Sequence, residues 1–203
     1  MTAKPRSMTV DSPVNIGVVL LAAGGSSRLG RPKQLVKFQG KTLIRRAAEI
    51  LLASDRSPVV VVLGAEIDIT SRELDGLDLT ICVNRDWSDG ISSSIKAGLE
   101  AMLSKSPDVA AVVIALCDQP FVAAGDIDRL VSEYRTSGNS IVAAKYSGTL
   151  GVPALFAREM FEGLFALTGD EGARKLIRRH ADQASAVEME AAAIDIDTPE
   201  DIP

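Results

Sequence analysis

Continuous runs of hydrophobic residues recur along the first half of the chain. They occupy residues 16–23 (IGVVLLAA), 58–64 (PVVVVLG), 78–84 (DLTICVN) and 109–117 (VAAVVIALC). These runs do not alternate with polar residues, so a strand built from any of them is apolar on both faces. Such strands are typical of parallel sheets that lie between two layers of helices. The pattern therefore predicts four buried, parallel strands.

Two segments between these runs repeat apolar residues at helical spacing. Residues 41–53 and 91–103 each place their apolar side chains on one side and polar side chains on the other, which predicts amphipathic helices. The apolar sides comprise Leu43, Ala47, Ile50 and Leu51 in the first helix, and Ile91, Ile95, Leu99 and Met102 in the second. Because strands and helices alternate, we predict a doubly wound, mainly parallel sheet in a single-domain, three-layer α/β/α, Rossmann-like fold.

The second half of the chain has a less regular pattern. Residues 126–138 predict a helix that Gly138 ends, and a strand is expected at 140–146. A further strand is expected at 151–156, followed by a helical stretch at 158–167. Another helix is expected to begin at 169–171.

The two ends of the chain differ from its middle. Residues 1–15 lack the apolar centre of a signal peptide and are interpreted as a disordered leader or a tail of artificial origin. Residues 191–203 (AAAIDIDTPEDIP) predict a short strand that runs into a helix start, with Thr198 as cap and Pro199 at the first helical position. We expect one domain over residues 16–203, because 203 residues leave no room for a second.

Composition and charge exclude several classes of partner. The formal charge is −5, and aromatic residues make up only 4% of the chain. Nucleic acid is therefore not an expected partner, because binding it requires a basic surface and aromatic stacking platforms. No apolar run reaches the roughly 18 residues of a membrane span, so no membrane association is expected. Cys82 and Cys117 form no CxxC pair, which favours a reducing, cytoplasmic location without zinc or disulfides.

A glycine-rich loop follows the first predicted strand at residues 22–33. Its glycines and serines allow backbone N–H groups to converge on anionic oxygens, and Arg28, Arg31 and Lys33 add positive charge. The order of glycines matches neither GxGxxG nor the P-loop motif. A surface connection without function is the alternative interpretation. The position of the loop favours phosphate binding, because ligands of open α/β sheets bind beyond the carboxyl ends of the strands.

An aspartate follows the fourth predicted strand directly. Asp118 belongs to the string Cys117-Asp118-Gln119-Pro120. A carboxylate at the exit of a central strand is well placed to hold Mg²⁺ against phosphate oxygens. The alternative is that Asp118 only caps a turn that contains a proline.

The loop sequence LAAGGSSRLGRPKQL at residues 21–35 resembles the LAxGxSxRxGxxK signature of a nucleotidyltransferase superfamily. Its members activate sugar phosphates, methylerythritol phosphate and molybdopterin, and the resemblance implies the nucleotide-diphospho-sugar transferase type of fold. It also implies that the loop backbone surrounds a nucleoside triphosphate whose charge Arg28 and Lys33 neutralise. The nucleotide-binding residues implied in this loop are Ala22, Ala23, Gly24, Gly25, Ser26, Arg28 and Lys33.

The string at 117–120 is similar to that of the molybdopterin cytidylyltransferase branch, in which the aspartate binds the metal. By this resemblance Asp118 is the first ligand of Mg²⁺. Asp197 in the segment DIDTPEDI matches the second carboxylate best, with Asp195 as the alternative. Two carboxylates, phosphate oxygens and water would form the oxygen-only octahedron that Mg²⁺ prefers.

Two further segments resemble the same family. Residues 84–99 are similar to the segment that closes over the base, where Asn84, Gly90 and Ser94 match the nucleotide-binding positions. Local capping by Asp89 or Ser92 is the simpler explanation of its polar residues. The strings GVPALF (151–156) and GDEGARKLI (169–177) are similar to the acceptor side of the molybdopterin branch, although Val152 stands where asparagine is frequent. The implied acceptor-binding residues are Gly151, Pro153, Asp170 and Arg174.

The resemblance implies transfer of CMP from CTP to the phosphate of molybdopterin, with release of pyrophosphate and delivery of the product to a molybdenum enzyme. Arg28, Lys33 and Asp118 are the expected catalytic residues. Ala22 and Ala23 favour CTP over GTP, since the guanylyl branch resembles LAGG there. A guanylyltransferase, an oxidoreductase that binds NAD(P)H and a cofactor chaperone remain alternatives. Cys117 is expected to be a packing residue, and His180, the only histidine, receives no role.

Overall fold

The computed structural model describes residues 14–25, 32–54 and 56–196. Its main feature is a seven-stranded sheet in the order β5-β4-β1-β6-β8-β7-β9. The strands are β1 (Ile16–Ala22), β4 (Val59–Leu63), β5 (Thr80–Val83), β6 (Ala111–Leu116), β7 (Ile141–Tyr146), β8 (Thr149–Ala157) and β9 (Ala184–Glu188). Only β8 runs antiparallel to its neighbours, β6 and β7. The predicted, mainly parallel sheet is thus confirmed, but the predicted burial of β5 is wrong, because this edge strand leaves Ile81 and Val83 exposed.

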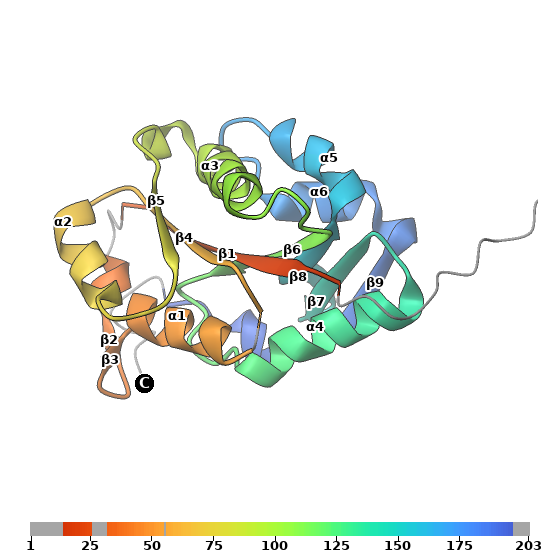
Figure 1. Ribbon diagram of the computed structural model, residues 1–203. Helices are drawn as coiled ribbons and strands as arrows, with labels where there is room; N and C mark the ends of the chain where they lie inside the picture. The colour runs from red at the N-terminus through yellow and green to blue at the C-terminus, as the bar shows by residue number, and fades with distance from the viewer. Residues whose placement is uncertain (1–13, 26–31, 55, 197–203) are drawn as a thin grey trace, which may run out of the picture.

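Helices cover both faces of the sheet, as Figure 1 shows. On one face lie α1 (Leu43–Ala53) and α4 (Ala124–Ser137), and on the other lie α3 (Ile91–Lys105), α5 (Phe161–Phe165) and α6 (Ala173–Arg179). Alternate residues of β1 point to the two faces, with Val18 and Leu20 in one core cluster and Val19 and Leu21 in the other. The three-layer α/β/α architecture predicted from the apolar runs is confirmed.

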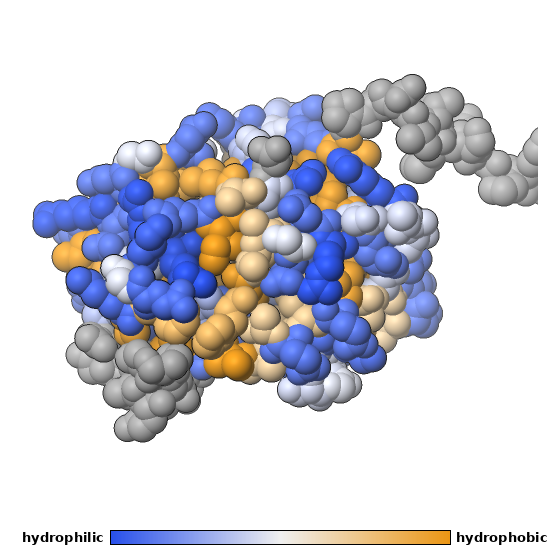
Figure 2. Space-filling view, turned by 90° about the horizontal axis from the view of Figure 1, so that it is seen from below, coloured by the Kyte–Doolittle hydropathy of each residue, from blue (hydrophilic) through white to orange (hydrophobic). Residues whose placement is uncertain are grey.

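The outer surface of the α1 and α4 layer is largely hydrophilic, with a hydrophobic strip across its centre (Figure 2).

The buried residues of α1 are Leu43, Ile44, Ala48 and Leu51. Of the predicted apolar side, Leu43 and Leu51 are buried and Ala47 packs half-buried against the core, whereas Ile50 is only half-buried and Ile44 and Ala48 were missed. In the described part of the chain, every helix is too short or too polar to cross a bilayer.

A small hairpin precedes α1 and brings distant segments together. It consists of β2 (Lys37–Phe38) and β3 (Lys41–Thr42), and follows the 3₁₀ turn η1 (Lys33–Leu35). Phe38 of the hairpin belongs to a third core cluster with the flanking Val36 and Leu43 and with Ile196 near the end of the chain. The remaining short elements are α2 (Ile67–Thr70), η2 (Ser71–Leu74), η3 (Trp87–Asp89), η4 (Arg158–Met160), η5 (Ala181–Gln183) and η6 (Glu190–Ala193).

Three predictions for the second half were wrong or incomplete. Strand β9 was not predicted, because it is a half-exposed edge strand without a continuous apolar run. The expected strand at the chain end is instead the 3₁₀ turn η6, followed by residues 194–196 without regular structure. The helical stretch at 158–167 is divided between η4 and α5. Thr198, Pro199 and residues 1–13 of the predicted leader (1–15) lie outside the described residues. Asn15, at the end of that leader, is instead part of the fold: its carbonyl oxygen accepts from the Ala110 N–H at 2.8 Å, and its Nδ2 donates to Ser106 Oγ at 2.7 Å.

Candidate active site

A cavity of about 380 Å³, here called the main cavity, opens at the carboxyl ends of β1 and β6. These two strands are neighbours at the centre of the sheet, so the segments that leave them lie side by side. The N-terminus of α3 and the turn η1 complete its walls. The residues predicted to bind the nucleotide that line this cavity are Ala22, Ala23, Gly24, Gly25, Lys33, Gly90 and Ser94.

Lys33 and Asp118 form an ion pair at one side of the main cavity. Lys33 Nζ lies 2.6 Å from Asp118 Oδ2, and the two side chains are only 21% and 14% exposed. The second carboxylate oxygen, Asp118 Oδ1, is buried and has no hydrogen-bond partner among the described residues. A buried carboxylate oxygen without a partner carries a desolvation cost that a bound cation would remove. Arg28, Arg31 and Ser26, predicted in the same loop, lie outside the described residues.

Gln34 lines the main cavity and fixes the backbone just after β1. Its side chain is buried, and Nε2 donates hydrogen bonds to the carbonyl oxygens of Ala22 at 2.9 Å and Gly24 at 2.7 Å. These bonds fix the backbone that lines the cavity. Sequence reasoning did not single out Gln34, although its place directly after Lys33 in the loop is a signal that could have found it.

The opposite wall is the start of α3. Gly90 is the N-cap residue, with φ of +103°, and a Cβ there would lie 2.3 Å from the Gly169 carbonyl. The predicted capping by Asp89 or Ser92 is therefore wrong, because the backbone conformation and the close approach of Gly169 require glycine at the cap. The Ser92 N–H donates instead to Gly169 O at 3.1 Å.

Asn84 organises this wall but does not line the main cavity. Its Nδ2 donates to Ser93 Oγ at 2.8 Å and to Ser94 Oγ at 3.0 Å, and its Oδ1 accepts from the Asp86 N–H at 3.0 Å. The amide thereby ties the exit of β5 to the first turn of α3. Asn84 therefore supports Ser94, which lines the main cavity, without lining the cavity itself.

Trp87 lines the main cavity beside the glycine loop. A Cβ at Gly25 would lie 2.9 Å from the Trp87 ring, and one at Gly64 would lie 2.6 Å from Trp87 Cβ. Two glycines thus allow the only tryptophan of the chain to pack beside the loop backbone. Sequence reasoning did not identify Trp87 as a site residue, although it lies within the segment 84–99 that was singled out.

A second cavity of about 250 Å³, the side cavity, adjoins the main one. Leu21, Ile91 and Leu116 line both. Arg174 lines the side cavity, as its predicted acceptor role requires, whereas Asp170 lines the main cavity. Gly151 and Pro153 line neither.

Tyr146 holds Arg174 in place. Arg174 Nη2 donates to Tyr146 Oη at 2.8 Å, and the guanidinium carbon lies 5.8 Å from the centre of the tyrosine ring. Tyr146 Oη in turn donates to Val152 O at 3.2 Å. A Cβ at Gly151 would lie 2.2 Å from Tyr146 Oη, so Gly151 gives this pair the space it occupies.

The end of the described chain returns to the Asp118 turn. The Ile196 N–H donates to Asp118 O at 3.0 Å, and Gln119 Nε2 donates to Ala192 O at 2.8 Å and to Val152 O at 3.1 Å. Asp195 lines the side cavity. Asp197, the preferred second metal ligand, lies outside the described residues. Within residues 14–25, 32–54 and 56–196, no group of three or more metal-binding side chains is found.

Cys117 lies between the strand and Asp118 but is not a nucleophile. Burial, together with the charge of Asp118, raises the pKa of its thiol to about 12, so the thiol stays protonated at neutral pH. Its side chain belongs to the core cluster under α1 and α4. The prediction that Cys117 is a packing residue is confirmed. His180 is the C-cap residue of α6 and lines neither cavity.

Comparison with known proteins identifies the family. The model of the MobA-like NTP transferase domain matches residues 18–184. Nicotine blue oxidoreductase from Paenarthrobacter nicotinovorans is 35% identical, over 94% of this chain and 95% of that protein. The 2-C-methyl-D-erythritol 4-phosphate cytidylyltransferase of Salinibacter ruber is 30% identical, over 89% of this chain and 78% of that protein.

A solved structure agrees with this assignment. Rv0371c from Mycobacterium tuberculosis H37Rv has a TM-score of 0.80 and 26% sequence identity, over 94% of this chain and 96% of that one. The fold class predicted from the sequence, that of the nucleotide-diphospho-sugar transferases, is confirmed, and so is the resemblance to nucleotidyltransferases. The chain belongs to the MobA-like NTP transferase family.

Proposed function

We propose that this protein transfers CMP from CTP to the phosphate of a molybdopterin-type acceptor in the cytoplasm and releases pyrophosphate. The observation that carries this proposal is the ion pair between Lys33 and Asp118, at 2.6 Å, where the two central strands end at the main cavity. The pair supplies one cation for a triphosphate and one carboxylate for a metal ion. Both are groups that phosphoryl chemistry requires.

The main cavity offers distinct partners for each part of CTP. The backbone of Ala22, Ala23 and Gly24, which Gln34 holds at Ala22 and Gly24, lines the cavity and is the part proposed to contact the base and ribose. The N-terminus of α3, where Gly90 and Ser94 line the cavity, places the positive end of the helix dipole beside the nucleotide. Lys33 neutralises the triphosphate, together with Arg28 from the same loop. Lys33 then exchanges its contact with Asp118 for the phosphate oxygens.

The residues at the Asp118 turn fit Mg²⁺. Within the part of the chain that the structure describes, Asp118 Oδ1 is buried without a partner, and the return of the chain end brings Asp195 to the same edge of the sheet. Asp118 would hold the ion together with Asp197 or Asp195, and carboxylate oxygens suit this hard cation. When bound, Mg²⁺ supplies positive charge that stabilises the negative charge developing on the α-phosphate and on pyrophosphate.

The chain needs no nucleophile of its own for this reaction. The acceptor brings an ionised phosphate whose oxygen attacks the α-phosphorus, while the bond from that phosphorus to pyrophosphate breaks. The protein holds the two substrates in line and stabilises the departing charge. This agrees with the protonated, buried thiol of Cys117 and with the position of His180 outside both cavities.

The side cavity provides a place for the acceptor. Its apolar walls suit a flat ring system, and Arg174 supplies a planar cation for an anionic group. Because both cavities share Leu21, Ile91 and Leu116, an acceptor there lies next to a nucleotide in the main cavity. Delivery of the product to a molybdenum enzyme belongs to the same proposal.

Fluorescence of Trp87 tests the nucleotide specificity. Trp87 is the only tryptophan and lines the main cavity, so its emission reports directly on binding. Titrations with CTP, GTP, ATP and NADPH, each with and without Mg²⁺, are expected to show the tightest binding for CTP, and only with the metal. Tight GTP binding would instead indicate guanylyl transfer. Calorimetry of the same ligands gives an independent check that does not depend on the tryptophan.

An oxidoreductase is the second candidate, because a relative that matches this chain over nearly its whole length is named nicotine blue oxidoreductase. Hydride transfer from NAD(P)H would not require the Lys33–Asp118 pair or a divalent ion. NADPH binding that is indifferent to Mg²⁺, together with weak CTP binding, would support this second function and contradict the first.

A further inference from the structure

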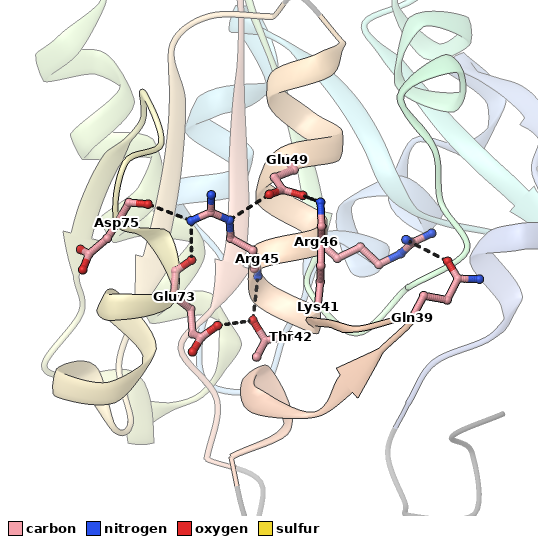
Figure 3. A network of polar contacts seen from close by, with 8 residues as sticks. All are labelled: Gln39, Lys41, Thr42, Arg45, Arg46, Glu49, Glu73 and Asp75. Carbon is pink, nitrogen blue, oxygen red and sulfur yellow. Dashed lines mark hydrogen bonds and ion pairs between the residues drawn. The ribbon is translucent and has the colours of Figure 1, made fainter.

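Arg46 lies on α1 and lines neither cavity, yet its guanidinium contacts both segments that carry the charged pair. Arg46 Nε donates to Pro120 O at 2.8 Å, two residues after Asp118. Its Nη1 donates to Gln39 Oε1 at 3.2 Å, at the tip of the hairpin that follows Lys33 (Figure 3). One side chain thus joins the Lys33 segment to the Asp118 segment.

Aromatic rings strengthen this connection. The guanidinium carbon of Arg46 lies 5.1 Å from the centre of the Phe38 ring, a cation–π distance. Phe38 packs edge-on against Phe121, with the ring centres 5.1 Å apart and an angle of 72° between the planes. Phe38 belongs to the hairpin and Phe121 to the turn after Asp118. The same two segments are therefore held together by a cation and two rings.

The Asp118 turn has a second support on its other side. The Ile196 N–H donates to Asp118 O at 3.0 Å, and the Ile196 side chain packs in the same small cluster as Phe38. Movement of the hairpin would therefore disturb both the cluster and the backbone bond at Asp118. Replacement of Arg46 should therefore accelerate amide hydrogen exchange at Ile196.

We propose that Arg46 is a positioning residue, which fixes the distance between Lys33 and Asp118 that nucleotide transfer requires. The inference rests on the proposed function, in which these two side chains act on the triphosphate and its metal ion. Arg46 acts through the backbone of the Asp118 turn and through the hairpin, without contacting the substrate. Small displacements of reacting groups reduce rates strongly, by about a hundredfold for 1 Å.

The neighbouring arginine offers a matched control. Arg45 Nε donates to Glu49 Oε1 at 2.9 Å, and its Nη1 donates to Glu73 O at 3.1 Å and Asp75 O at 2.8 Å. Glu73 and Asp75 lie on the side of α1 away from Gln39, as Figure 3 shows, whereas Glu49 lies on α1 itself and also accepts from Lys41 of the hairpin. Arg45→Met therefore removes a similar set of hydrogen bonds, none of which is made directly to the hairpin or to the Asp118 turn.

The experiment compares Arg46→Met, Arg46→Lys and Arg45→Met in the full chain, below the temperature at which each variant unfolds. Amide hydrogen exchange at Ile196 is expected to be at least about tenfold faster in Arg46→Met, because local opening accelerates exchange. With CTP and molybdopterin, we expect kcat to fall about 10- to 100-fold. The Mg²⁺ concentration for half-maximal turnover should rise, while KM for molybdopterin stays unchanged.

Arg46→Lys should recover part of kcat, since lysine keeps one charged donor but lacks the guanidinium fork. Arg45→Met should leave Ile196 exchange and kcat within about twofold of the wild type, as expected for contacts that do not reach the site. Unchanged Ile196 exchange in Arg46→Met, or equal effects in Arg45→Met, would overturn the inference. Absence of CTP turnover in the wild type would contradict the proposed function instead, and Ile196 exchange would still show whether Arg46 positions the Asp118 turn.

Discussion

Asp118 presents two oxygens in different states. Oδ2 is paired with Lys33 at 2.6 Å, while Oδ1 is buried without a hydrogen-bond partner in residues 14–25, 32–54 and 56–196. Leaving a buried acceptor unpaired costs about 1–3 kcal/mol, and more for a charged group. Buried polar atoms without a partner are typical of binding sites, where a ligand supplies the missing contact. A protein tolerates the loss of stability there because its function requires the atom to be available. At the residue scale, this oxygen favours a bound cation.

Replacement of either member of the pair should abolish most of the activity. We expect Lys33→Ala and Asp118→Asn each to lower turnover with CTP at least about a hundredfold, since each removes one preorganised charge from the reacting phosphates. Steady-state kinetics measure this loss. Lys37→Ala, which removes an exposed lysine of β2, is the control and should remain near the wild type. Near-normal turnover of Asp118→Asn would refute the metal assignment.

Tyr146→Phe tests the acceptor side. The variant keeps the ring beneath Arg174 but removes the oxygen that accepts the 2.8 Å hydrogen bond. Because hydrogen bonds to charged groups contribute about 1.5–3 kcal/mol, we expect KM for the acceptor to rise about tenfold or more. The Kd for CTP should not change. Tyr134→Phe on α4 is the control, and an equal rise of KM there would contradict the assignment.

The residues of the site were not equally accessible to sequence reasoning. Lys33 and Asp118 could be predicted to meet, because each follows a buried strand and the carboxyl ends of parallel strands share one edge. Tyr146 could not, because its partner Arg174 is 28 residues away, on another element. The place of Gln34 directly after Lys33 could have suggested a site residue, but its bonds to backbone carbonyl groups leave no sequence pattern that shows its role.

At the scale of elements, helix α3 owes its position to a close approach to the sheet. A Cβ at Gly98 would lie 2.5 Å from Val19 Cγ1 and 2.8 Å from Val62 Cγ2. The helix therefore packs directly on β1 and β4 at this point. Its N-terminus, which carries Gly90 and Ser94, is held against the main cavity as a result.

Gly98→Ala should be destabilising, although alanine is normally the better helix former. Overpacking of a tight core costs about 1–3 kcal/mol, which exceeds the roughly 1 kcal/mol gained in helix propensity. Gly125→Ala in α4 has nothing within 4 Å of the added methyl group and should be neutral or stabilising. Urea denaturation measures both free energies of unfolding. Equal stability of the two variants would show that α3 does not pack as closely as described.

The prediction of elements succeeded where strands are buried on both sides. Strands β1, β4 and β6 are continuous apolar runs in the sequence and fully or almost fully buried in the structure. Strand β9 alternates weakly and lies at the sheet edge, so its sequence lacks that signal. The chain end was misjudged because its conformation depends on distant partners, including Asp118 and Gln119, rather than on its own pattern.

At the scale of the whole molecule, the sheet order places both cavities at one edge. Strands β1 and β6 end there, and the antiparallel strand β8 begins there, next to β6. The end of the described chain lies at the same edge, because the Ile196 N–H donates to Asp118 O. A nucleotide between the parallel strands and an acceptor beside β8 would thus meet at the boundary between the parallel and antiparallel parts of the sheet.

The most direct test of the account is a crystal structure of the protein with CTP and Mg²⁺. We predict that the triphosphate occupies the main cavity against Lys33 and that the ion lies about 2.1 Å from an oxygen of Asp118, the distance typical of Mg²⁺. A nucleotide bound elsewhere, or an ion held without Asp118, would contradict the central claim that this ion pair marks the site of nucleotide transfer.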